Sequence, residues 1–472
     1  MNIEGFRHAS YQAIDRICDY FLSLEERPVL PSVQPGFLRG LLPNHVPDSG
    51  EDIQQIADDF RDTILPESIL GELYSSSIAN PGFNWHCSPV STELEEIVMD
   101  WSCKLLGLSD AFLNTSETGG GVLGTTACDS VLVTIVAART TFLQLNPGLS
   151  QQDLVLYITS QTHILGCKAA AILGLAYTVL EVAKEGDYSL RGKTLLAAIK
   201  KDAGNGRHPF FLIATVGSTS NGSVDRIDEL GPILVSNGIW MHVDAAWAGL
   251  ALACPEYRDV CQLEAINKYA DSFCINFHKW GLVSLEASAL WVRNRQWLMQ
   301  ALDVTPEYLR TIHVEDNVND YRNWQFSLSR RSRSLKMWFV LRGFGIQGLQ
   351  GYIRKTISLC QMFYKLVENS SDFQLVGRPF LSLAVFRLRP KDSLLFSVNA
   401  DEQTLNDLNR IFHRKLLIHD LFLTQTMLDG MFCIRFNVGA TRTEERHIMN
   451  AWKTICSQIE PAIAEWVKYY VP

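Results

Sequence analysis

Short apolar runs alternate with stretches of helical spacing along the middle of the chain. The runs Phe211–Val216, Ile239–Val243 and Ser272–Ile275 have the length of buried strands, and Ile227–Asn237 between the first two has helical spacing. Strands that alternate with helices in this way predict crossover units and a mainly parallel sheet. We therefore expect residues 81–355 to form a large α/β domain.

The pattern changes on the N-terminal side of this region. Residues 1–80 are expected to be mostly helical, because Phe6, Ile14, Ile17 and Phe21 fall on one face of a first helix.

The C-terminal part mixes both periodicities. Strands are expected at Leu383–Leu388 and Phe432–Phe436, and helices at Thr404–Leu416 and Glu444–Tyr470. Residues 356–472 are thus predicted to form a small α+β domain.

Bulk composition changes this picture only by exclusion. The chain has 472 residues, of which 47% are hydrophobic, and these are dispersed, so we expect no membrane span. A net charge of -9 gives no reason to expect nucleic-acid binding. The 11 cysteines form no C-x-x-C pair and no zinc-ligand spacing, and the N-terminus lacks the apolar core of a signal peptide. We expect a cytoplasmic protein with reduced thiols and no metal.

The densest basic stretch lies near residue 333. It consists of Arg330, Arg331, Arg333 and Lys336, and apolar side chains interleave with it. This interleaving predicts the ion-paired start of an internal helix, because a solvated basic face would not carry apolar residues at these places.

The strongest chemical signal is Lys279, in the sequence Asn276-Phe277-His278-Lys279. It follows the apolar run Ser272–Ile275, and a side chain at the carboxyl end of a buried strand points into the crevice where α/β sheets bind ligands. A desolvated amine there becomes a nucleophile toward carbonyls, which is how lysine carries pyridoxal phosphate (PLP). A single lysine of this kind is more often a snorkelling surface side chain; other features of the chain favour the cofactor.

Asp244 ends a second apolar run, Ile239–Val243, and is followed by Ala245 and Ala246. A carboxylate at this place can hydrogen-bond the protonated pyridine nitrogen of PLP and keep the ring an effective electron sink. Ala246 lacks bulk, so the ring can lie against its methyl group. The alternative is that Asp244 only caps the next helix; its joint occurrence with Lys279 favours the cofactor role.

A segment of small residues, Thr118–Cys128, leads into helical apolar spacing over 129–138. A loop before a helix offers unpaired backbone N–H groups and the positive end of the helix dipole to a phosphate. Gly119, Gly121 and Gly124 formally match the dinucleotide G-x-G-x-x-G pattern. However, no strand precedes them and no acidic residue stands about twenty residues onward. We expect the phosphate of a different cofactor at this loop.

These three elements, in this order, resemble the group II PLP-dependent decarboxylases, and within them the aromatic-L-amino-acid decarboxylases. The similarity extends along almost the whole chain and includes the segments Arg27–Leu38, Ser91–Glu95, Pro209–Thr219, Asp320–Gln325 and Arg330–Trp338. The resemblance implies an α/β protein of PLP-dependent transferase fold type I (aspartate aminotransferase-like), with a mainly parallel sheet and a small C-terminal α+β domain. It also implies a homodimer in which residues 1–80 form a flap on the partner subunit.

Four residues match the catalytic positions of the family. Lys279 should bind PLP covalently, Asp244 should bind the pyridine nitrogen, and His163 should stack on the free face of the ring. Tyr308 matches a loop tyrosine that protonates the α-carbon after carbon dioxide has left. Relatives with phenylalanine at this position release an aldehyde, so Tyr308 together with His163 favours an amine as product.

Further positions match the cofactor contacts of the family. These are Ala127, Cys128, Thr219, Ala246, Asn276 and His278. Ala127, Cys128 and Asn276 should hold the phosphate. The family usually has serine where Cys128 stands, and because a thiol is a poorer donor, the phosphate should depend more on backbone amides here.

The substrate pocket departs from the family. Relatives carry an aromatic-rich segment that lines this pocket, and here Pro66 runs directly into Ile69–Tyr74 without it. Pro81 and Phe83 still match pocket positions. Gly343 stands where some relatives use glycine for indoles and a larger residue for phenols, which favours tryptophan as substrate.

Three functions are therefore left open by the sequence. The first is decarboxylation of an aromatic L-amino acid, with tryptophan favoured and tyrosine, DOPA or phenylalanine also possible. The second is aldehyde synthesis, or decarboxylation of another amino acid. The third is a PLP-binding pseudoenzyme, produced by the missing segment. The absence of that segment marks a natural short form, a splice product or a remodelled pocket.

Overall fold

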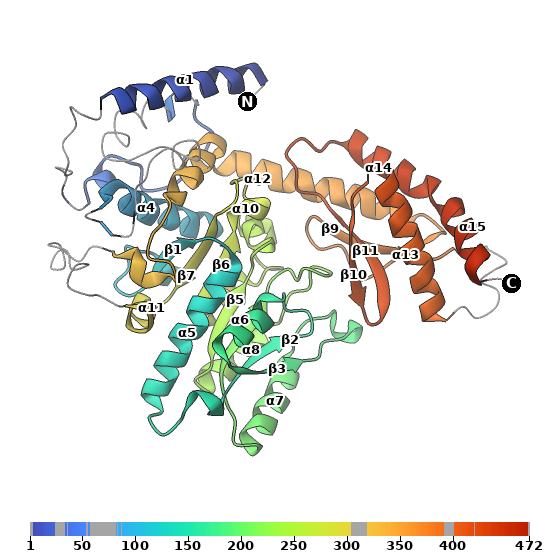
Figure 1. Ribbon diagram of the computed structural model, residues 1–472, viewed down its shortest axis with the longest axis horizontal. Coiled ribbons are helices and arrows are strands. Elements are labelled where there is room, and N and C mark those ends of the chain that lie inside the picture. The colour runs from blue at the N-terminus through green and yellow to red at the C-terminus, as the bar shows by residue number, and fades with distance from the viewer. Residues whose placement is uncertain are drawn as a thin grey trace. The chain divides into compact units, whose positions relative to one another are not determined.

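The computed structural model (Figure 1) describes residues 3–23, 34, 36–52, 55–56, 82, 84–85, 87–303, 319–390, 401–419 and 421–470. The chain divides into two compact units. Unit 1 comprises Met1–Gln152 and Ala270–Leu349, and unit 2 comprises Asp153–Tyr269 and Gln350–Pro472. The boundaries that the sequence suggests, at residues 81 and 356, stay a prediction.

Unit 1 contains three strands in the order β1 (Gly120–Gly124), β7 (Ser288–Val292) and β6 (Ser272–Asn276). Both pairs are antiparallel, and Val292 of the central strand is opposite Gly120 on one side and Ser272 on the other. Among its described residues, the helices are α1 (Ile3–Leu22), α4 (Pro89–Leu106), α5 (Ala127–Leu145), α10 (Phe277–Trp280), α11 (Arg295–Leu302) and the first part of α12 (Arg333–Glu368). Short 3-10 turns lie at Leu38–Gly40, Asp110–Phe112 and Tyr321–Trp324.

The small-residue segment before α5 is a strand over most of its length, so the prediction of a loop over Thr118–Cys128 was wrong for Gly120–Gly124. The glycines are there because β1 lies against large side chains. A Cβ on Gly120 would lie 2.5 Å from the Trp324 ring, and one on Gly121 would lie 2.7 Å from the Trp291 ring. Only Thr125 and Thr126 are left as the turn into α5.

Helix α5 is long and apolar enough to cross a membrane by length and composition alone, although the sequence pattern led us to expect no such segment. In the fold it contacts α11, β6 and β7 of its own unit. Its residues Val131, Ile135 and Ala137 are fully buried there. These contacts bury part of the helix and account for part of its apolar composition.

Unit 2 contains a four-stranded parallel sheet and a smaller antiparallel sheet. The parallel strands run in the order β5 (Trp240–Asp244), β4 (His208–Thr215), β2 (Leu154–Thr159) and β3 (Ala176–Leu180). The helices that alternate with them are α6 (Leu165–Leu173), α7 (Gly192–Gly204), α8 (Ile227–Ser236) and α9 (Leu263–Tyr269). This alternation confirms the crossover pattern expected from the sequence.

The antiparallel sheet belongs to the C-terminal part of the chain. Its order is β10 (Thr424–Leu428), β11 (Met431–Asn437), β9 (Leu383–Leu388) and β8 (Phe373–Leu375). Helices α13 (Glu402–Ile418), α14 (Glu445–Ser457) and α15 (Ile459–Tyr470) accompany it. Phe363 of α12 packs into its core, where its ring stacks on Phe436 with centroids 3.7 Å apart.

The C-terminal segment that was expected to form one helix forms two. The sequence pattern predicts a single helix over Glu444–Tyr470, but the structure ends α14 at Ser457 and begins α15 at Ile459. Pro461 explains the break, because a proline lacks the N–H for a helical hydrogen bond and is tolerated only in the first turn of a helix.

The basic stretch near residue 333 leads into α12, and the predicted ion pairing is found for Arg330 and Arg333, whereas Arg331 is exposed. Arg330 pairs with Glu95, Arg333 with Glu286 at 3.2 Å, and Lys336 Nζ donates to the Leu285 carbonyl at 2.9 Å.

Candidate active site

The residues expected to bind PLP fall into two groups, one in each unit. In unit 1, Lys279 follows the buried strand β6 and lies exposed in the short helix α10. The Gly281 N–H donates to the Phe277 carbonyl at 2.8 Å and closes this turn. An accessible amine is thus held at the carboxyl end of a buried strand.

His278 lies next to Lys279 and is fixed by the backbone. His278 Nδ1 lies 3.0 Å from the Ala287 N–H and 3.1 Å from the Ala287 carbonyl, so the backbone of Ala287 holds the ring in place. Burial and then the charge of Lys279 lower the pKa of His278.

The phosphate side of the site is the first turn of α5. Thr126 and Asp129 form a capping box at its start. The N–H groups of Ala127 and Cys128, the first two residues of α5, have no hydrogen-bond acceptor among the described residues. These two donors are therefore available to an anion at the positive end of the helix dipole.

Asn276 lies close to this turn. It is opposite Ser288 in the β6–β7 ladder, and Ser288 Oγ is 3.4 Å from Ser130 Oγ in the first turn of α5. Asn276 Oδ1 is buried and has no hydrogen-bond partner among the described residues. Because amide oxygen and nitrogen can be exchanged by a flip, this buried amide can present donors to a phosphate.

In unit 2, Asp244 ends β5 opposite Thr215, the last residue of β4. Its carboxylate is 4% exposed, and Oδ1 accepts the Ala246 N–H at 3.0 Å. The alternative interpretation of Asp244 as a helix cap is wrong, because the N-cap of the next helix, Ala248–Ala253, is Trp247, and the bond to Ala246 instead fixes the turn before it. This bond also orients the carboxylate and places Ala246 directly beside it.

Thr219 follows the end of β4 in the sequence, and His163 follows the end of β2. The carboxyl ends of parallel strands lie at one edge of a sheet, so Asp244, Thr219 and His163 share this edge. The Leu165 N–H donates to His163 Nδ1 at 3.2 Å, which fixes the ring of this half-buried histidine. Gly217, with φ +82°, makes the turn before Thr219, and a Cβ there would lie 2.4 Å from the Ala248 Cβ.

Three of the predicted site residues, Tyr308, Pro81 and Phe83, lie outside the described residues. Gly343 is exposed in α12, and a Cβ placed on it would contact nothing within 4 Å.

Sequence reasoning missed a carboxylate that supports the carboxyl edge of unit 2. Asp225 is buried and accepts the N–H groups of Thr215 and Leu190, at 2.8 Å and 2.7 Å. Burial raises its pKa to about 6. A lone aspartate after a turn carries no sequence signal of this role, because the pattern is that of an ordinary turn residue.

His242, two residues before Asp244, predicts a pH-dependent stability. It is buried against the Phe211 ring, with centroids 6.2 Å apart, and burial lowers its pKa from 6.5 to about 4. The unfolded chain therefore binds a proton between these pH values that the folded chain does not. The free energy of unfolding should fall by about 1.4 kcal/mol for each pH unit below 6.5, down to about pH 4, and this part of the stability is complete above pH 6.5.

The substitution His242→Phe isolates this contribution. Urea unfolding of wild type and variant at about pH 7, 6 and 5 should show a pH slope that is smaller by about one proton in the variant. Equal slopes would show that His242 titrates normally in the folded protein.

In unit 1, a lysine at a strand end and a helix N-terminus with free N–H donors suit a PLP-dependent enzyme. The alternation of parallel strands and helices in unit 2 is that of fold type I. Comparison with known proteins gives the family. The pyridoxal-dependent decarboxylase conserved domain matches residues 35–389. The chain belongs to the group II PLP-dependent decarboxylases, in the branch of the aromatic amino-acid decarboxylases, and is a carboxy-lyase.

The similar proteins cover this chain almost completely. Tyrosine decarboxylase 2 of Narcissus pseudonarcissus is 39% identical over 97% of this chain and 94% of its own length. Phenylacetaldehyde synthase of Arabidopsis thaliana is also 39% identical, over 96% of both chains. The crystal structure of Oryza sativa TDC with PLP and tryptamine is 31% identical, with a TM-score of 0.79 over 98% of this chain and 99% of that chain.

The residues of this chain fit PLP. The buried, unpartnered Asn276 amide and the two free N–H groups of α5 are donors suited to a phosphate, and Lys279 is an accessible amine. The cofactor of this family is PLP.

Proposed function

We propose that this chain decarboxylates an aromatic L-amino acid, with tryptophan favoured, to the arylalkylamine and carbon dioxide. The observation that carries the proposal is Lys279, exposed at the end of β6 beside a His278 that the backbone of Ala287 holds in place. A pseudoenzyme tends to lose its chemical groups first, and here Lys279, Asp244, His163 and Tyr308 are all retained.

In the proposed mechanism, bound PLP supplies an electron sink for the pair left on the α-carbon when carbon dioxide departs. Lys279 Nζ would hold the cofactor covalently. Asp244 would keep a proton on the pyridine nitrogen, and His163 would lie against the ring. Tyr308 then gives a proton to the α-carbon.

Ala127 and Cys128 are proposed to bind the phosphate through their backbone N–H groups, with Asn276 as a third donor. Thr219 and Ala246 are proposed to support the ring, and His278 to lie beside its attachment point. Pro81, Phe83 and Gly343 are proposed to contact the substrate.

We further propose a homodimer. Phe326, Leu285 and Leu328 of unit 1 are 79%, 66% and 47% exposed. Helix α1 also exposes Tyr11 and Ile14. Large apolar side chains of this kind support burial against a partner subunit, and the flap role proposed for residues 1–80 would provide it. A cytoplasmic location is proposed as well, supported by 11 free cysteines.

Aldehyde synthesis is the second candidate, because phenylacetaldehyde synthase is as similar to this chain as tyrosine decarboxylase 2. Tyr308 favours the amine. The two outcomes differ in their consumption of oxygen and in the product released.

The substrate is tested by comparing kcat/KM for tryptophan, tyrosine, phenylalanine, DOPA and glutamate in wild type and in Gly343→Ser. We expect wild type to prefer tryptophan. Because a Cβ at position 343 meets no neighbour, the serine should leave the fold intact and shift the tryptophan-to-tyrosine ratio about tenfold toward tyrosine. Activity on glutamate alone, or on none of the five, would contradict the proposal.

A further inference from the structure

Strand β1 is at one end of the strand order and has β7 on one side only. On its other side, side chains take the place of a neighbouring strand. The Gly121 N–H donates to Asn114 Oδ1 at 3.1 Å. The Leu123 N–H donates to Glu95 Oε1 at 2.8 Å, and the Leu123 carbonyl accepts from Arg330 Nη2 at 3.0 Å. Both backbone groups of Leu123 are therefore held by one pair of side chains.

Glu95 and Arg330 are themselves tightly paired. Their closest atoms are 2.5 Å apart, and the side chains are 3% and 4% exposed. Arg330 Nε donates to Gln325 Oε1 at 2.9 Å, and the guanidinium lies 4.7 Å from the centre of the Tyr321 ring. A guanidinium held on this many sides has one orientation. Because burying two charges is costly, such a pair is poor evidence for stability and better evidence for a fixed geometry.

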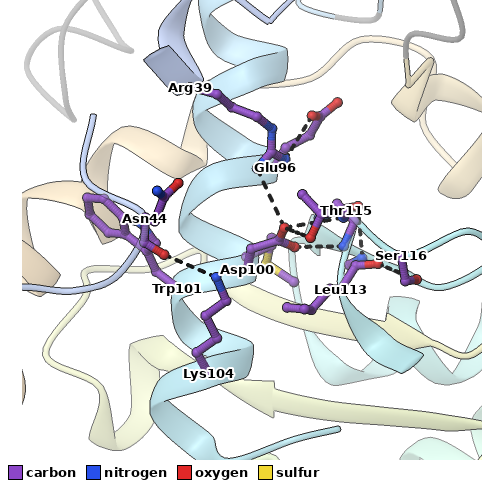
Figure 2. A network of polar contacts seen from close by, with 12 residues as sticks. Arg39, Asn44, Glu96, Asp100, Trp101, Lys104, Leu113, Thr115 and Ser116 are labelled. Atoms are coloured by element: carbon purple, nitrogen blue, oxygen red, sulfur yellow. Dashed lines mark hydrogen bonds and ion pairs between the residues drawn. The ribbon is translucent and has the colours of Figure 1, made fainter. Parts of the chain in front are cut away.

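The helix that carries Glu95 is fixed along its length by other acids, as Figure 2 shows for Glu96 and Asp100. Asp100 accepts the Thr115 hydroxyl at 3.0 Å and the Asn114 N–H at 2.6 Å, and Asn114 is the residue that binds Gly121. Glu96 accepts from Arg39 at 3.1 Å. Helix α4 is thus joined to β1 directly through Glu95 and indirectly through Asp100 and Asn114.

Leu123 is four residues before Ala127, where α5 begins with its two free N–H donors. We propose that the Glu95–Arg330 pair positions the phosphate-binding turn, by fixing Leu123 so that these donors stay aimed at the cofactor's phosphate. This role rests on the proposed phosphate contacts of Ala127 and Cys128. A fixed turn matters more in this chain than in relatives with serine, since the Cys128 thiol adds only a weak donor.

The test compares the affinity of the apoenzyme for PLP with its affinity for pyridoxal, which has the same ring and aldehyde but no phosphate. In the double variant Glu95→Leu, Arg330→Met both charges are removed together, so no unpaired buried charge remains. The Kd for PLP, followed by absorbance, should rise about tenfold, corresponding to one or two lost charge-assisted hydrogen bonds. The Kd for pyridoxal should change less than about twofold. Glu95→Gln, which keeps an acceptor for the Leu123 N–H, should lie between wild type and the double variant.

Glu96→Gln is the matched control, because Glu96 is the next residue of α4 and its carboxylate pairs with Arg39 and Asn319 and not with β1. The ratio of its Kd for PLP to its Kd for pyridoxal should equal that of wild type. A Glu95 and Arg330 variant that weakens both ligands equally, or neither, would overturn the proposal.

The substitution Cys128→Asp tests the proposed phosphate site separately from the positioning role of Glu95 and Arg330. It places a carboxylate where the phosphate is proposed to bind. If Cys128→Asp lowers the affinity for PLP relative to the affinity for pyridoxal while both Glu95 variants do not, the phosphate site stands and the positioning role fails. If Cys128→Asp also leaves the ratio unchanged, the phosphate site itself is wrong and the positioning role falls with it.

Discussion

Lys279→Ala should abolish turnover and the visible absorbance of bound PLP together. The lysine amine is the only group proposed to bond covalently to the cofactor, and no neighbouring side chain replaces it in α10. We expect a fall in kcat of at least about a thousandfold, the size seen when a covalent catalytic group is removed. Borohydride treatment should fix PLP to the wild-type protein, and peptide mapping should find it on Lys279.

Lys104→Ala provides the control for this experiment. Lys104 belongs to the same unit, and its Nζ donates to the Asn44 carbonyl at 3.1 Å on the surface of α4 (Figure 2). Its removal should leave absorbance and turnover unchanged. A Lys279→Ala protein that still turns over substrate, or a borohydride label on another lysine, would refute the assignment of the covalent site.

Asp244→Asn should keep PLP bound but slow the reaction. The buried carboxylate is oriented by the Ala246 N–H and is proposed to hold the proton on the pyridine nitrogen, which an amide cannot do. Electrostatic groups of this kind contribute about a hundredfold to a thousandfold in kcat. The visible absorbance should persist, which distinguishes this variant from Lys279→Ala.

Asp202→Asn is the matched substitution for Asp244→Asn. Asp202 is also a buried carboxylate of unit 2, but it accepts from the Tyr157 hydroxyl at 2.9 Å, away from the carboxyl edge of the sheet. Its kcat should match wild type. If Asp244→Asn keeps more than about a third of wild-type kcat, the carboxylate does not act on the ring nitrogen.

How far the sequence predicts this protein depends on which forces decide each element. The strand β9 has the predicted bounds, because Leu383–Leu388 is fully buried along its whole length. β1 could not be predicted in this way. Its glycine-rich sequence resembles a loop, and only the proximity of Trp291 and Trp324 makes glycine the residue that fits a strand there.

The candidate site follows the same distinction. Lys279, Asp244 and the α5 N-terminus each belong to, or directly follow, the strand or helix that positions them. Local sequence patterns therefore reveal them. The pair Glu95 and Arg330 is separated by 235 residues, and neither residue has a local pattern that predicts a contact with Leu123. Such a contact depends on tertiary packing, which a single sequence does not display.

The most direct test of decarboxylation is the stoichiometry of the PLP-loaded wild-type enzyme with carboxyl-labelled tryptophan. Labelled carbon dioxide, tryptamine and oxygen uptake should be measured in the same reaction. The proposed function predicts one carbon dioxide and one tryptamine for each tryptophan consumed, with no oxygen uptake. Carbon dioxide released with oxygen uptake and aldehyde, or no carbon dioxide from any aromatic amino acid while PLP remains bound, would contradict it.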